Sequence, residues 1–187
     1  MRDIRYLRPF AAAAALVAFA LPARAAVTVL GGDMAHQCSI AALAGQSDEM
    51  AEAKCTMALD GEFLSPRDRA GTFVNRGVLK LRRKDFTAAQ GDFDRAIEAE
   101  PKMGEAYVNR GAAAVGVRRY AQGVADINKA LQLGVEEPEK AYYNRALAYE
   151  GLDDMKAAYF DYQKALELKP DWDQPKKELS RFTVERR

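Results

Sequence analysis

The sequence predicts an all-α protein built from repeated helical hairpins, and three recurring features indicate this. One stretch occurs three times, as "FVNRGVLKL" from Phe73, "YVNRGAAAV" from Tyr107 and "YYNRALAYE" from Tyr142. These stretches fall in consecutive blocks of 34, 35 and 34 residues, at 70–103, 104–138 and 139–172. Small and bulky residues also recur at fixed positions within each block. A period in this range is typical of stacked helical repeats.

Within each block, these fixed positions predict two helices that pack closely. Position 8 is Gly77, Gly111 or Ala146, and positions 20 and 27 are also small, so two helices can approach there. Positions 4, 17 and 24 are bulky in all three blocks. Pro101 and Pro170 follow the second helix, which a proline cannot extend.

This pattern resembles the tetratricopeptide repeat family. The resemblance covers residues 70–172, which is 103 of the 187 residues. It implies one pair of antiparallel helices per repeat, stacked into a right-handed α-solenoid with a concave inner groove. Such arrays bury each repeat against its neighbours and need a cap at both ends.

The flanking sequences predict these caps. Residues 26–69 read as a degenerate repeat in which Ala51 and Ala58 occupy positions 20 and 27, and residues 66–69 ("PRDR") are left as an insert. Residues 173–187 read as a capping helix and tail. Leu179 and Phe182, three residues apart, predict one apolar stripe on a helix over about 174–184.

Residues 1–25 read as a secretory signal peptide. Three arginines precede the apolar run at 10–21, and Ala23-Arg24-Ala25 is a small-x-small cleavage site, so we expect cleavage after Ala25. The alternative is an uncleaved anchor, but about a dozen apolar residues are short for a bilayer span. We therefore expect a periplasmic protein, or a secreted one if the source is not Gram-negative, without membrane insertion after cleavage. Ala26, which is not a cysteine, argues against a lipid anchor.

The composition argues against nucleic-acid binding and catalysis. After cleavage the chain carries 24 Lys and Arg against 26 Asp and Glu, which leaves no basic excess for phosphates. His36 is the single histidine, and no catalytic set can be completed around it. Met34, His36 and Cys38 in "MAHQC" would suit copper, but a helix start with a disulfide cysteine is favoured. We expect no enzyme, metal or cofactor.

Cys38 and Cys55 are predicted to form a disulfide. They are the two cysteines of a chain that we expect to be exported, and an oxidising compartment favours the bond. In the degenerate repeat they occupy positions 7 and 24, which lie at nearly one level of a helical hairpin.

A second cross-link is predicted in each of the three repeats. Position 7 is always arginine and position 23 always aspartate, 16 residues later. An antiparallel pair that turns near position 15 brings these positions to the same height. We therefore expect three structural ion pairs: Arg76–Asp92, Arg110–Asp126 and Arg145–Asp161. The alternative, an anionic ligand on the arginines, is less economical because each arginine has its own carboxylate.

The resemblance implies that the first helix of each repeat lines the groove. The residues expected there are Val74, Asn75, Val78, Tyr107, Val108, Asn109, Ala112, Tyr143, Asn144 and Leu147. Each asparagine can donate and accept, which suits the backbone of an extended peptide or a helix end, although each could instead bond a neighbouring helix. The tyrosines are expected to act as aromatic anchors for a partner.

Some members of the family hold the C-terminal acid of a chaperone in a two-carboxylate clamp. Asn109 and Lys140 match that clamp here, whereas Val74, Val78 and Asn144 stand where Lys, Asn and Arg are needed. We expect no such clamp.

These features predict a non-enzymatic scaffold or adaptor of the bacterial cell envelope that binds a protein or peptide in its groove. Two alternatives stay open: a structural component that self-associates, and a redox- or metal-responsive protein that uses Cys38 and Cys55.

Overall fold

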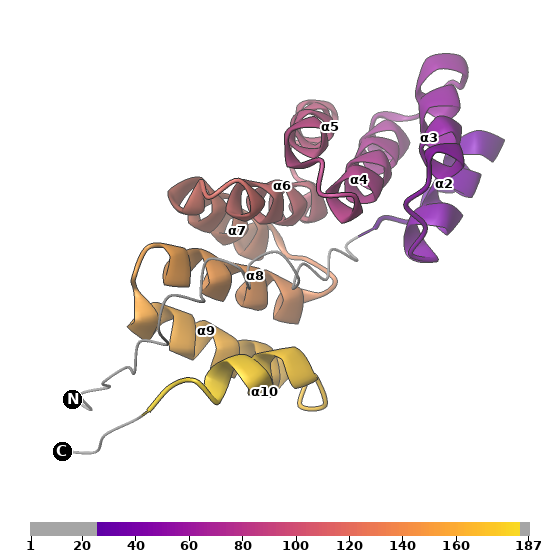
Figure 1. The fold of residues 1–187 in the computed structure, drawn as a ribbon. Coiled ribbons are helices and arrows are strands. Elements are labelled where there is room, and N and C mark those ends of the chain that lie inside the picture. The colour runs from indigo at the N-terminus through magenta and orange to yellow at the C-terminus, as the bar shows by residue number, and fades with distance from the viewer. Residues whose placement is uncertain (1–25, 184–187) are drawn as a thin grey trace.

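The computed structural model describes residues 26–183, which form α-helices and no strand. The helices are α2 (Asp33–Leu43), α3 (Glu49–Gly61), α4 (Pro66–Arg82), α5 (Phe86–Ala99), α6 (Gly104–Gly116), α7 (Tyr120–Leu133), α8 (Pro138–Gly151), α9 (Met155–Leu168) and α10 (Asp173–Leu179). The predicted all-α solenoid is confirmed over this part of the chain (Figure 1). The expected signal peptide lies outside the described residues.

The helices pair into four antiparallel hairpins, α2/α3, α4/α5, α6/α7 and α8/α9, and α10 packs on α9. First helices also contact one another from hairpin to hairpin: α2 contacts α4, α4 contacts α6, and α6 contacts α8. The hairpins therefore stack in chain order, with α2 and α3 at one end and α10 at the other (Figure 1).

The three repeats turn in the same way. Lys84, Arg118 and Asp153, each at position 15, have left-handed φ angles of 64°, 63° and 61°. The second helices begin two residues later in each case, at Phe86, Tyr120 and Met155. This shared turn sets the antiparallel register within each hairpin.

Close approach of the paired helices depends on the small residues. A Cβ atom added to Gly77 would lie only 2.4 Å from Cε1 of Phe93, which is fully buried. The Phe93 ring thus occupies the space that a side chain at position 8 would need. This is the packing that the alternation of small and bulky positions predicts.

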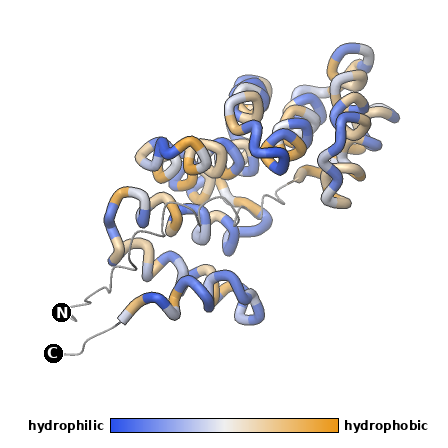
Figure 2. The backbone as a smooth tube through the Cα atoms, in the orientation of Figure 1, coloured by the Kyte–Doolittle hydropathy of each residue, from blue (hydrophilic) through white to orange (hydrophobic). Residues whose placement is uncertain are grey.

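Polar and apolar residues are mixed along the helices of the described chain (Figure 2). None of the helices in residues 26–183 combines the length and the apolar character that a membrane crossing requires.

Two expected boundaries differ from the structure. Residues 66–69 are not an insert but the first turn of α4, because the Ser65 side chain accepts from Asp68 N and Pro66 occupies the first turn. Serine followed by proline is a strong helix start. The capping helix spans Asp173–Leu179 and is shorter than expected, although Leu179 and Phe182 both pack on the C-terminal core.

Candidate functional site

An extended segment, residues 26–30, lies against α4 and is held there by an asparagine. Val27 N donates to Asn75 Oδ1 at 2.8 Å, and Asn75 Nδ2 donates to Val27 O at 2.8 Å. Asn75 is fully buried. One amide thus satisfies both main-chain groups of one residue, which is the use of asparagine that suits an extended peptide.

The other two predicted groove asparagines are engaged differently. Asn109 Nδ2 donates to Glu105 O, one turn earlier in the same helix, at 2.9 Å. Asn144 is 2 % exposed, and its Oδ1 has no hydrogen-bond partner within the described residues. A buried acceptor without a donor is costly and uncommon in native proteins.

Most of the residues expected to line an open groove are buried in the structure. Val74 and Val78 belong to the core cluster that includes Phe73 and Phe93, and Ala112 joins the same cluster. Val108 and Leu147 are buried in neighbouring clusters. Most of the position 5 and 9 side chains therefore pack between helices, and among them Val108 also borders a hollow.

Tyr143 is not the free anchor that we expected. It is fully buried, with its ring centroid 5.5 Å from that of Tyr162 and 5.0 Å from that of Trp172. Its aromatic surface is used by the C-terminal core. Tyr107 is partly exposed and donates to Pro101 O at 3.3 Å, so it is the tyrosine that a partner could reach.

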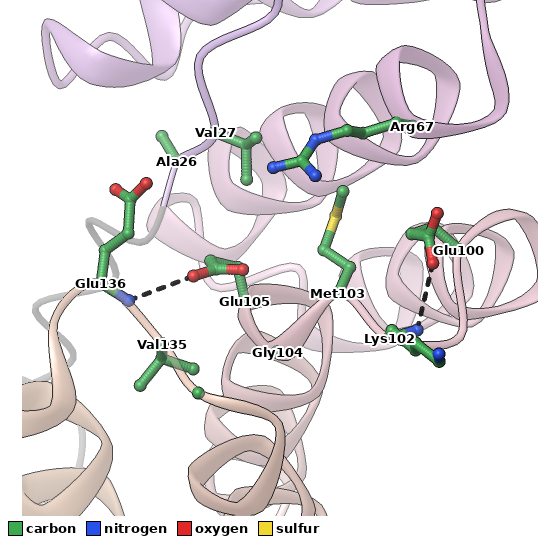
Figure 3. Close-up of a pocket in the computed structure, with 11 residues that line it drawn as sticks. Ala26, Val27, Arg67, Glu100, Lys102, Met103, Gly104, Glu105, Val135 and Glu136 are labelled. Atoms are coloured by element: carbon green, nitrogen blue, oxygen red, sulfur yellow. Dashed lines mark hydrogen bonds between the residues drawn. The ribbon is translucent and has the colours of Figure 1, made fainter.

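Two hollows border Ala26, and loop residues Val135 and Glu136 line both together with residues of the neighbouring helices. The first, of about 520 Å³, lies between residues 26–27, Arg67, Met103, Glu105 and Glu136 (Figure 3). The second, of about 430 Å³, shares Ala26, Glu105 and Glu136 and reaches Val108 and Lys140. The loop at 134–136 was not identified from the sequence as part of a site. The extra residue of the middle block, which has 35 residues, was the feature that marked this loop.

The three arginines of position 7 each meet their aspartate with two hydrogen bonds. The Nε and Nη2 atoms donate over 3.0 and 2.7 Å in Arg76–Asp92, 2.9 and 2.6 Å in Arg110–Asp126, and 2.7 and 2.7 Å in Arg145–Asp161. Such two-point pairs are the strong form of the interaction. The hydrogen bond to Asp126 raises the pKa of Arg110, and that to Asp161 raises the pKa of Arg145.

Each of these arginines also reaches the preceding hairpin. Arg76 Nη1 donates to Thr56 of α3, Arg110 Nη1 to Asp94 of α5, and Arg145 Nη1 to Asn128 of α7. One side chain thus ties its own hairpin to the one before it. With these donors occupied, the structure favours the structural role of the arginines over an anion site.

The aromatic residue of the repeated stretch completes the same unit. The guanidinium carbons of Arg76, Arg110 and Arg145 lie 5.6, 5.5 and 5.1 Å from the ring centres of Phe73, Tyr107 and Tyr142. Cations are attracted to ring faces at such distances. In the aromatic-x-Asn-Arg stretch, the arginine thus stacks on the aromatic ring and pairs with its aspartate. The asparagine between the aromatic residue and the arginine supplies a side-chain amide.

Cys38 and Cys55 form a disulfide that links α2 to α3, and both residues are fully buried. His36 Nδ1 lies 3.0 Å from Val29 O. In residues 26–183 no three His, Cys, Asp or Glu side chains are grouped so that they could hold a metal ion.

A polar cluster anchors the C-terminal cap on the groove helix α8. Arg181 Nη2 pairs with Glu150 and, at 2.6 Å, with Glu178. Burial raises the pKa of Glu178, and the positive charge of Arg181 only partly opposes this.

Glu178→Gln is expected to stabilise the protein near pH 7. Because its pKa is higher in the folded state, Glu178 binds a proton more tightly there, and its contribution to stability falls as pH rises above the ordinary value of 4.5. Urea unfolding of both proteins at about pH 4.5 and pH 7 should show the advantage of the variant growing with pH. A variant that is less stable at pH 7 would show that the pair with Arg181 outweighs burial.

Comparison with known proteins identifies the repeat. A family profile described as "Tetratricopeptide repeat" matches residues 139–171, which contain α8 and α9. The protein carries a tetratricopeptide repeat domain.

Proteins with this domain include several that the chain resembles. It is 36 % identical over 87 residues to the Hsp70-Hsp90 organizing protein of Triticum aestivum. This alignment covers 46 % of the chain and 14 % of the relative. Two solved tetratricopeptide domains superpose on 62 % of the chain and 95 % of their own length. The Arabidopsis OM64 domain is 26 % identical with a TM-score of 0.59. The second domain of human RPAP3, solved with the HSP70 peptide SGPTIEEVD, is 25 % identical with a TM-score of 0.57. The chain thus spans a small part of the wheat relative.

Proposed function

We propose that this tetratricopeptide protein is a non-enzymatic adaptor that binds an extended peptide or protein segment along the face formed by α4, α6 and α8. The observation that carries the proposal is the pairing of Asn75 with both main-chain groups of Val27. Asn144 offers the same amide chemistry at the same position of the third repeat, whereas Asn109 already donates to Glu105 O. The unpartnered Oδ1 of Asn144 supports this, because a peptide N–H would satisfy it.

The RPAP3 structure supports a peptide as the ligand class, since that domain was solved with a peptide. The chain's own residues argue against a terminal-carboxylate clamp. Val74 and Val78 are in the core, and Lys140 is paired with Glu137. The ligand we propose is therefore recognised through its main chain, at sites that differ from the clamp.

The proposed location is the bacterial envelope. The proposal depends on the sequence of residues 1–25, and the disulfide between Cys38 and Cys55 is consistent with an oxidising compartment.

Self-association is the second candidate, and one observation favours it. The α2/α3 hairpin exposes apolar side chains that contact with a second copy would cover. They are Ile40, Leu43, Met50 and Met57.

Photo-cross-linking in the native envelope fraction tests the proposal. A photoreactive residue replaces Val135, which lines both hollows, and the matched control replaces Lys164, a partly exposed residue of α9 that lines neither. We expect a partner band from position 135 alone, and a weaker band when Asn144→Leu is added. Equal bands from both positions would contradict groove binding, and a band at twice the monomer mass would favour self-association.

A further inference from the structure

Residues 26–30 alternate in the manner of a β-strand. Val29 is 1 % exposed and Val27 is partly buried, whereas Thr28 is exposed and Leu30 is 81 % exposed. In an extended chain, alternate side chains point to opposite faces. The two valines therefore share the face that is turned to α4.

A single glycine on α4 receives both valines. A Cβ atom added to Gly71 would lie 2.9 Å from Val29 Cγ2 and 3.3 Å from Val27 Cγ1. Gly71 and Asn75 are four residues apart and so lie on the same face of the helix. On this face of α4, Gly71 leaves room for two β-branched side chains of a ligand. The neighbouring Asn75 amide can pair with the ligand's main chain.

We propose that this face of α4 is a peptide site whose built-in occupant is the chain's own segment, residues 26–29. The ligand class follows from the occupant: an extended peptide with β-branched residues at two alternate positions and a small residue before the first. A partner segment of this kind reaches Asn75 only by displacing residues 26–29. This inference rests on the proposed peptide-binding function and names the ligand and its competitor.

Displacement starts at Ala26 and Val27, which are only partly buried and whose main-chain pairing depends on one side chain, Asn75. Val29 is held more firmly, because it shares a core cluster with Ala35 and Ala58 and its carbonyl oxygen lies 3.0 Å from His36 Nδ1. The two hollows that border Ala26 leave about 520 and 430 Å³ that the segment does not fill. A longer peptide can use this space. Competition is nevertheless strong, because a short tether gives the segment an effective concentration of about millimolar.

The test is the binding of a labelled peptide, acetyl-Ala-Val-Thr-Val-Leu-Gly-amide, measured by fluorescence anisotropy with the purified protein. Val27→Pro/Val29→Asp disables the built-in segment, because proline lacks the N–H that Asn75 accepts and aspartate cannot occupy an apolar seat. Gly71 and Asn75 stay intact. We expect binding to this variant at least about tenfold tighter than to the unmodified protein.

Two controls fix the site. Adding Asn75→Ala to the released variant should remove the gain, and a peptide with proline in place of its first valine should not bind. Equal binding to the unmodified and released proteins would overturn the built-in occupancy. A folded released variant that binds no peptide would overturn the ligand class.

Hydrogen exchange of the unmodified protein tests the occupancy without a released variant. The Val27 amide should be protected, and Asn75→Ala should speed its exchange at least about tenfold. Rapid exchange in the unmodified protein would overturn the proposal. These outcomes are separate from the cross-linking test, since a partner held at α6 and α8 could be captured whether or not α4 accepts this peptide.

Discussion

Asp92→Asn is expected to lower the free energy of unfolding by about 3–5 kcal/mol, the usual loss when one side of a buried ion pair is removed. Asp92 is 2 % exposed and Arg76 is 8 % exposed. The Asp92 carboxylate also receives Lys80 Nζ at 2.8 Å. Asparagine keeps the shape of the side chain but leaves two cations next to each other without their shared counter-charge.

Urea unfolding followed by circular dichroism measures this loss, and Asp94→Asn is the matched control. Asp94 also bonds a position 7 arginine, Arg110, but its side chain is 60 % exposed. An exposed pair contributes at most about 1 kcal/mol. Similar losses in both variants would show that burial does not set the strength of these pairs.

Features that depend on the repeat could be predicted from the sequence. The Arg–Asp pairs follow from their 16-residue spacing and from one turn per hairpin. Each pair therefore depends only on the sequence of its own hairpin. The aromatic at position 4 was assigned to packing and, in Tyr107, also to partner binding, and its contact with the arginine of position 7 was missed. That contact is also local, three residues along one helix, and the constant spacing was its signal.

Features that depend on segments outside the repeat could not be predicted. Asn75 pairs with Val27, which lies 48 residues earlier and outside the three repeats. Tyr143 is buried because Tyr162 and Trp172 pack on its ring, and Trp172, the last residue of the third block, follows the helices to which the groove expectation applied. The predicted groove assumed that corresponding positions are equally accessible in all three repeats. In the structure, segments at the two ends of the stack cover some of these positions and not others.

Reduction of the Cys38–Cys55 disulfide is expected to destabilise the N-terminal hairpin selectively. The bond closes a loop of 17 residues, which corresponds to about 3 kcal/mol in the chain-entropy model. Repeat arrays are stabilised by each unit and its neighbours, so a loss at one end need not unfold the other. Both cysteines share a core cluster with Leu79 of α4, and this packing keeps α2 and α3 attached after reduction.

Hydrogen exchange with and without reductant, read by mass spectrometry, checks this expectation. Amides of α2 and α3 should lose protection while those of α8 and α9 keep theirs, and Cys38→Ser/Cys55→Ser should behave as the reduced protein in both conditions. Residues 26–30 precede α2 directly and His36 lies against Val29 O, so protection of Val27 should fall together with that of α2. The disulfide would then also hold the segment on Asn75. Equal loss of protection through α9 would mean that the solenoid unfolds as one cooperative unit, and the segment would have no separate dependence on the bond.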